Sequence, residues 1–284
     1  MKTVITATRL FTPLECIESP VVVVEDGRIL AVDSRQNMEA PTNAKYLDFP
    51  DAILVPGFID IHVHGGSGHD VMETDASALA AIERHTARHG VTSYLPTTVT
   101  APEDRILRAL EYLGKRISRQ EYTDGGSRPI GIHLEGPFIS HAKPGVHPPE
   151  YLVPPSPQMF ERYWQASGGT LRLMTIAPEL PGAIDTIRHA RKAGVHSSIG
   201  HSNATYGEAN ESIDAGADHA THTFNAMRPL DHREPGILGA VLTDDRLTAD
   251  IIADGIHTDP SMVKLFLNAK GPERAILITD AISA

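Results

Sequence analysis

From residue 53 onward, short apolar runs that end in polar residues alternate with longer segments of helical spacing. This alternation is typical of repeated β-α units, in which helices cover a sheet of parallel strands. Eight such runs lie approximately at residues 58–65, 92–99, 130–137, 171–178, 195–202, 218–224, 248–254 and 275–281. Eight parallel strands predict an α/β fold, a closed (β/α)8 barrel of the TIM type.

The segments between the runs predict amphipathic helices at residues 76–89, 102–120, 183–193, 204–215 and 260–269. Several of them end at a glycine that can take a left-handed conformation: Gly90, Gly194, Gly216 and Gly271. Loops rich in Pro and Gly follow the third and sixth runs, at residues 137–157 and 229–239. Both loops are expected on the face where barrel enzymes build their active sites.

Residues 1–52 predict a small β-domain that forms part of a β-sandwich. Two β-type runs joined by the turn Glu25-Asp26-Gly27 predict a hairpin within it. The chain ends four residues beyond Asp280, so the barrel at residues 53–284 is expected to lack its last helix. We expect such a chain to expose the outer face of its eighth strand and to be poorly soluble or inactive.

Composition excludes several classes of partner. The formal net charge of −11 disfavours nucleic acid and anionic membranes, so an anionic ligand needs a local basic pocket. A single cysteine, Cys16, excludes an internal disulfide and fits a reducing compartment. The start of the chain does not resemble a signal peptide, and no apolar run reaches membrane-spanning length. These features predict a cytoplasmic protein.

Ionisable residues stand at the ends of five of the predicted strands. His62 and His64 alternate along the first run, so their side chains point to the same side. Such a half-buried ring of charges is costly unless a divalent cation is shared among its members. The candidate ligands are His62, His64, Glu135, His201, His222 and Asp280. Because cysteine is absent from the set, Zn²⁺, Fe²⁺ and Mn²⁺ all suit it; we favour zinc. Seven further histidines are interpreted as packed or surface residues: His85, His89, His141, His189, His196, His219 and His232.

Several longer motifs surround these residues. They are Pro56-Gly57-Phe58-Ile59-Asp60-Ile61-His62-Val63-His64-Gly65, His133-Leu134-Glu135-Gly136-Pro137-Phe138, Gly200-His201-Ser202, His222-Thr223-Phe224-Asn225-Ala226-Met227, Arg233-Glu234-Pro235-Gly236, Asp254-Gly255-Ile256-His257 and Thr279-Asp280-Ala281. With them the chain resembles the amidohydrolase superfamily, and within it the deacetylases of phosphorylated N-acetyl amino sugars. The resemblance covers the chain from the β-domain to its last residue.

The resemblance implies a role for each matching residue. Glu135, His201 and His222 would hold one metal ion, and His62 and His64 would complete a second site that Glu135 bridges. Asp280 would be both a metal ligand and the proton shuttle. The substrate-binding residues implied by the resemblance are His147, which would polarise the carbonyl as a catalytic residue, together with Asn225, the Ala226 backbone, Arg233 and His257. Relatives are homodimers, so Arg233 would act across the interface.

The implied reaction is the metal-dependent hydrolysis of N-acetyl-D-glucosamine 6-phosphate to D-glucosamine 6-phosphate and acetate, a step of amino-sugar catabolism. The galactosamine epimer or another amide remains an alternative, because the same metal ligands serve several substrates. A second alternative is a non-catalytic scaffold, against which the complete set of ligands argues. The sequence leaves open whether one or two metal ions bind.

Overall fold

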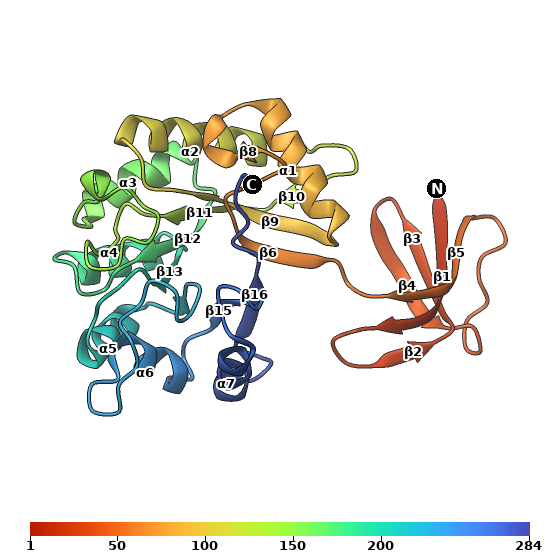
Figure 1. The fold of residues 1–284 in the computed structure, drawn as a ribbon. Helices are drawn as coiled ribbons and strands as arrows, with labels where there is room; N and C mark the ends of the chain where they lie inside the picture. Colours follow the sequence, from red (N-terminus) through yellow and green to blue (C-terminus); the bar gives the residue numbers. More distant parts are fainter. The chain divides into compact units, whose positions relative to one another are not determined.

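The computed structural model describes residues 1–284, which divide into two compact units, Met1–Phe58 and Ile59–Ala284 (Figure 1). The first unit is one five-stranded sheet of β1 (Lys2–Phe11), β2 (Cys16–Glu18), β3 (Pro20–Glu25), β4 (Arg28–Ser34) and β5 (Lys45–Leu54). The predicted hairpin joins β3 to β4, and Asp26 and Gly27 have φ of 50° and 75° as a two-residue turn of this kind requires. β5, which the sequence analysis did not predict, pairs in parallel with β1.

The second unit is an α/β fold around a curled parallel sheet (Figure 1). Its strands are β6 (Phe58–Val63), β9 (Val91–Thr98), β11 (Ile132–Glu135), β12 (Leu171–Ile176), β13 (His196–Ile199), β14 (His219–Ala220), β15 (Ala249–Ile252) and β16 (Ala275–Ile278), with the short pieces β7 (Gly65–Gly66), β8 (His69–Asp70) and β10 (Arg128–Pro129) beside them. Each of the predicted strand segments therefore contains a strand. Apolar side chains of these strands and of the helices form the main core of the unit.

Parallel pairing connects β6 to β9 and continues through β11, β12, β13 and β14, while β15 pairs with β16. Beside β14, Thr223 N donates to Asp250 O at 2.8 Å, which joins this part of the sheet to β15. At the other side, Asp280 N donates to His62 O at 3.1 Å, and Val63 forms a parallel bridge with Ala281. The chain that follows the last strand therefore lies beside the first strand.

The helices are α1 (Ala76–Arg88), α2 (Glu103–Ser118), α3 (Pro157–Ala166), α4 (Ala183–Lys192), α5 (Tyr206–Ala215), α6 (Gly236–Thr243) and α7 (Pro260–Lys270), with 3₁₀ turns η1 (Val71–Glu73) and η2 (Pro149–Tyr151). The five predicted helices are present, and all four predicted glycines at their ends have positive φ. No helix is long and apolar enough to cross a membrane.

Two helices were missed. α3 begins where the first predicted loop ends; the Ser156 side chain accepts from Met159 N, and Pro157 occupies the first turn. The second predicted loop, residues 229–239, is wrong over its last four residues, because α6 begins at Gly236. Most of α6 is buried, so its sequence is almost uniformly apolar and lacks the alternation that identifies a helix with one exposed face.

Candidate metal centre

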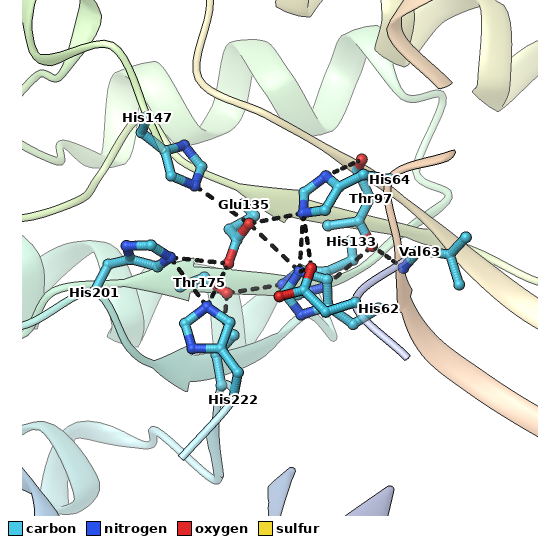
Figure 2. A network of polar contacts seen from close by, with 12 residues as sticks. His62, Val63, His64, Thr97, His133, Glu135, His147, Thr175, His201 and His222 are labelled. Carbon is cyan, nitrogen blue, oxygen red and sulfur yellow. Dashed lines mark hydrogen bonds and ion pairs between the residues drawn. The ribbon is translucent and has the colours of Figure 1, made fainter. Parts of the chain in front are cut away.

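Seven of the predicted site residues meet at one end of the curled sheet, and Figure 2 shows most of them pointing toward one another. They are His62 on β6, His64 just after it, Glu135 at the end of β11, His147 in the loop that follows β11, His201 after β13, His222 after β14 and Asp280 after β16. His201, His222 and Asp280 have φ of 45°, 29° and 49°, which is uncommon for residues other than glycine. Such strained positions concentrate at functional sites.

The Glu135 carboxylate lies at the centre of the cluster and is 2% exposed. Its Oε1 lies 3.1 Å from His222 Nε2 and 3.4 Å from His201 Nε2. Its Oε2 lies 3.0 Å from His64 Nε2 and 3.4 Å from His62 Nε2. One carboxylate oxygen thus faces each pair of histidines, an arrangement that a bridging ligand between two metal ions would need.

Asp280 completes the group on the side of His62 and His64. Its Oδ1 lies 3.4 Å from the Nε2 atoms of both histidines. The side chain is 21% exposed, whereas that of His62 is fully buried and that of His64 is 11% exposed. Asp280 is therefore a member of the cluster that solvent can reach.

The histidine nitrogens fit a divalent cation. His64 Nδ1 lies 3.0 Å from Thr97 O and His201 Nδ1 lies 2.9 Å from Lys143 O, so both rings carry their proton on Nδ1. Their Nε2 lone pairs then point into the cluster, where His64 Nε2 is 3.1 Å from His62 Nε2 and His201 Nε2 is 3.0 Å from His222 Nε2. Facing lone pairs at this distance repel unless a cation or a proton lies between them. The donor set is that of a metal site with imidazole and carboxylate ligands.

Electrostatics within the cluster favour ionised groups despite burial. Burial alone would raise the pKa of Glu135, but the charge of His62 and hydrogen bonds from neighbouring histidines hold that pKa well below its usual range. Burial opposes protonation of His62, yet the charges of Glu135 and Asp280 raise its pKa to about 10. Burial lowers the pKa of His201.

His147 differs from His64 and His201 in the ring nitrogen that carries its proton. Thr100 N donates to His147 Nδ1 at 3.2 Å, and Thr100 Oγ1 lies 2.8 Å from the same atom. Nδ1 is thus an acceptor, and the proton lies on Nε2, which is 3.3 Å from Glu135 Oε2. His147 is 2% exposed and presents a donor to the site rather than a lone pair. This geometry suits a group that donates to a carbonyl oxygen better than a metal ligand.

The predicted substrate-binding residues are not all brought together. Asn225 N donates to His222 O at 2.9 Å, and Ala226 O accepts from Ser202 N at 3.0 Å, so both adjoin the histidines of the cluster. The Arg233 and His257 side chains are exposed and do not contact the cluster; His257 Nδ1 pairs with Asp254 Oδ2 at 2.8 Å. The roles of these residues in substrate binding stay predictions.

Two buried carboxylates that were not predicted as site residues hold the backbone of histidines in the cluster. Asp60 and Asp250 are 3% and 0% exposed and accept from the backbone N–H groups of His62 and His222. The sequence does contain a signal for Asp250, which is an acidic residue inside the apolar run at residues 249–252. An acidic residue is rarely buried without a partner, so this position indicates a contact with another polar group. No comparable signal identifies Thr100, a neutral residue in a loop.

Imidazoles and carboxylates at the strand ends of an α/β sheet define the class of metal-dependent hydrolases. The amidohydrolase family matches residues 53–280, and the chain belongs to this family.

Within this family, the chain is similar to deacetylases of phosphorylated N-acetyl amino sugars. The chain is 37% identical to the N-acetylglucosamine-6-phosphate deacetylase of Bacillus subtilis (strain 168), over 97% of the chain and 69% of that relative. It is 38% identical to the N-acetylgalactosamine-6-phosphate deacetylase of Escherichia coli O157:H7, over 100% of the chain and 72% of that relative. The crystal structure of N-acetyl-D-glucosamine-6-phosphate deacetylase from Mycobacterium smegmatis superposes with a TM-score of 0.90 at 37% identity, covering 99% of this chain and 71% of that one.

Proposed function

We propose that the chain hydrolyses the acetamide group of an N-acetylhexosamine 6-phosphate, N-acetyl-D-glucosamine 6-phosphate in the first place, to acetate and the amino sugar 6-phosphate. The observation that carries the proposal is the central Glu135 carboxylate, with one oxygen toward His201 and His222 and the other toward His62 and His64. The deacetylases to which the chain is similar support the choice of substrate.

The proposed ligands are His62, His64, Glu135, His201, His222 and Asp280, which would hold one or two divalent ions. A divalent metal polarises a carbonyl oxygen and lowers the pKa of water. Zinc is favoured because imidazole and carboxylate donors at buried positions are its usual protein ligands, and Fe²⁺ and Mn²⁺ remain alternatives.

Asp280 would transfer the proton, and His147 would stabilise the charge on the carbonyl oxygen. An amide nitrogen leaves poorly until it is protonated, so hydrolysis needs a group that takes a proton from water and returns it to the amine. Asp280 suits this role, since its partly exposed carboxylate lies against His62 and His64. The Nε2–H of His147 would donate to the acetamide oxygen, on which negative charge develops during attack.

Recognition of the phosphate would depend on local groups, because the chain has a net charge of −11. We assign it to Asn225, the Ala226 backbone, Arg233 and His257. The guanidinium of Arg233 can bind two phosphate oxygens at once, and it is exposed on this chain, as an arginine that acts on a neighbouring subunit of a homodimer would be. The cytoplasmic location stays a prediction.

The galactosamine epimer is a second candidate substrate, favoured by the similarity to the Escherichia coli enzyme. The two sugars differ in the orientation of one hydroxyl group, and the metal ligands do not distinguish them. A non-catalytic scaffold is disfavoured, because such a protein has no need to keep a buried and costly cluster of ionisable groups.

Acetate release by the purified, zinc-loaded protein tests the proposal, and activity of this protein would also show that the sequence-based expectation of a poorly soluble or inactive chain is wrong. The substrates are N-acetylglucosamine 6-phosphate, its galactosamine epimer and unphosphorylated N-acetylglucosamine. We expect one of the phosphorylated sugars to be hydrolysed with the highest kcat/KM and the unphosphorylated sugar with a kcat/KM lower by about 100-fold or more, as loss of charge-assisted contacts implies. Equal values with and without phosphate would refute the phosphate pocket, and absence of bound metal would refute the metal-dependent reaction.

A further inference from the structure

The histidines of the cluster are held in two different ways. The rings of His64 and His201 donate from Nδ1 to backbone carbonyl oxygens at 3.0 and 2.9 Å. Such outer contacts normally fix the orientation of a histidine that binds metal. The Nδ1 atoms of His62 and His222, in contrast, are buried and have no hydrogen-bond partner. The rings of this second pair therefore need another means of orientation.

The two histidines without a ring partner are held through their backbone. His62 N donates to Asp60 Oδ1 at 3.2 Å, and His222 N makes a short hydrogen bond to Asp250 Oδ1. A second contact, from Thr223 N to Asp250 O at 2.8 Å, holds the next residue to the same strand. Because His222 has a φ of 29°, its backbone is strained and needs such support to aim the ring at Glu135.

Asp250 is itself held in place by a second histidine. His219 Nε2 donates to Asp250 Oδ2 at 2.8 Å, and His219 Nδ1 lies 2.7 Å from Thr248 Oγ1. Asp250 is 0% and His219 4% exposed, so these hydrogen bonds are shielded from water. Both carboxylate oxygens of Asp250 are thus occupied, one by His219 and one by the backbone of His222.

We propose that Asp250, aimed by His219, is a positioning residue that orients the metal ligand His222 through the main chain. A histidine that binds metal is normally oriented by a carboxylate or carbonyl that contacts its ring. Asp250 would serve the same purpose for His222 by contacting its backbone instead. The inference rests on the proposed metal-dependent function. No hydrogen bond joins Asp250 or His219 to another side chain of the cluster, so we expect Asp250 to act on zinc binding chiefly through the position of His222.

The test compares zinc affinity, measured by competition with a chromogenic chelator, in three variants of the full chain. Asp250→Ala removes the acceptor for His222 N and should weaken zinc binding about 10- to 100-fold, the effect typical of losing an outer contact of a ligand. Asp250→Asn keeps an acceptor oxygen for His222 N, and its amide can donate to His219 in the other tautomer. This variant should therefore bind zinc within about threefold of the wild type.

Lys270→Met is the matched control. Lys270 is likewise a buried charged residue, 1% exposed, with hydrogen bonds to backbone atoms, the carbonyls of Val241 and Asp244. Its loss should lower thermal stability without changing zinc affinity. Unchanged zinc affinity in Asp250→Ala would overturn the proposal, and so would an equal weakening in Lys270→Met. Failure of the wild type to bind zinc would instead refute the proposed function, and the positioning role with it.

A second measurement covers the case in which Asp250→Ala does not fold. Selective ¹⁵N labelling of histidine in the metal-free wild type should show the His222 amide proton shifted downfield and protected from exchange, since its hydrogen bond is charge-assisted and buried. In Asp250→Asn the amide should stay protected and lose part of the downfield shift. Exchange of the His222 amide as fast as that of the exposed His232 would contradict the proposal.

Discussion

Asp280, the proposed proton shuttle, is the more exposed of the two carboxylates in the cluster, at 21% against 2% for Glu135. Asp280→Asn keeps an oxygen near His62 and His64 but lacks a carboxylate that can accept a proton. We expect kcat to fall about 100- to 10,000-fold, the usual contribution of a general acid-base group, while zinc content stays near that of the wild type. Acetate release and zinc analysis on the same preparation measure both. A variant with bound zinc and undiminished kcat would exclude Asp280 as the proton shuttle.

Single residues also show which parts of the site could be predicted from the sequence and which could not. The alternation of His62 and His64 along one strand was readable, because strand geometry fixes which side chains share a face. His147 as a residue in a Pro-rich loop has no such signal, and only the resemblance suggested a function. Thr100, 47 residues earlier in the chain, determines which of its ring nitrogens is the acceptor. His219 was interpreted as a packed or surface histidine, because its partner Asp250 comes from a different strand, 31 residues away.

At the scale of strands, Asp60 joins the chain that follows β16 to β6. Its Oδ2 accepts from Thr279 Oγ1 at 2.6 Å, and its Oδ1 accepts from His62 N at 3.2 Å. Asp60→Ala would leave these donors without an acceptor in a buried place, at a cost of about 1–3 kcal/mol for each. We expect the melting temperature of the metal-free protein to fall by about 2–4 °C per kcal/mol lost.

Circular dichroism on heating measures the effect, with Asp60→Asn as the control because it retains an acceptor for one donor. We also expect Asp60→Ala to lower the enzymatic activity by more than the loss of folded protein accounts for, since Thr279 precedes Asp280 and sets its position. An Asp60→Ala protein with an unchanged melting temperature would show that the two strands hold together without this side chain.

Helix prediction depended on an exposed polar face, which the five predicted helices have and the missed helix α6 lacks. The five predicted helices alternate apolar and polar faces, and five of the predicted strands lead into ionisable residues of the site. α6 is mostly buried and has no polar face, so its sequence resembles an apolar loop next to Pro235. β14 has only two residues as a strand, because the chain turns at His222 to present its ring. The limits of such elements depend on tertiary contacts that the pattern does not contain.

On the scale of the molecule, the proposed metal ions would join strands that are far apart in the sequence. The proposed ligands come from β6, from the end of β11 and from the segments after β13, β14 and β16. Zinc at about 1,000 times its dissociation constant should therefore stabilise the fold by about 4 kcal/mol. Chelation should lower the melting temperature by about 8–16 °C at this size, and zinc should restore it. A melting temperature indifferent to chelator, with zinc shown to be removed, would contradict a site shared among the strands.

Arg233 raises the question of whether one chain suffices for activity. Its side chain is exposed and does not contact the cluster of its own chain, so the proposed phosphate contact would be made on a second subunit. Arg233→Ala and Asp280→Asn should each be nearly inactive alone on the phosphorylated sugar. A mixed dimer of the two has one site with both an intact Asp280 and an Arg233 from the neighbour. Co-expression should then restore about a quarter of the wild-type activity, because half of randomly assembled dimers are mixed and each has one intact site.

Asp280→Asn co-expressed with His222→Asn is the matched control, because both residues belong to the cluster of a single chain and no mixed dimer then contains an intact site. Light scattering on the same samples establishes whether dimers form. Recovery only with Arg233→Ala would place this arginine in its neighbour's site. If dimers form and neither mixture recovers, Arg233 acts within its own chain, and the loop at residues 229–235 must then move for its guanidinium to reach the phosphate.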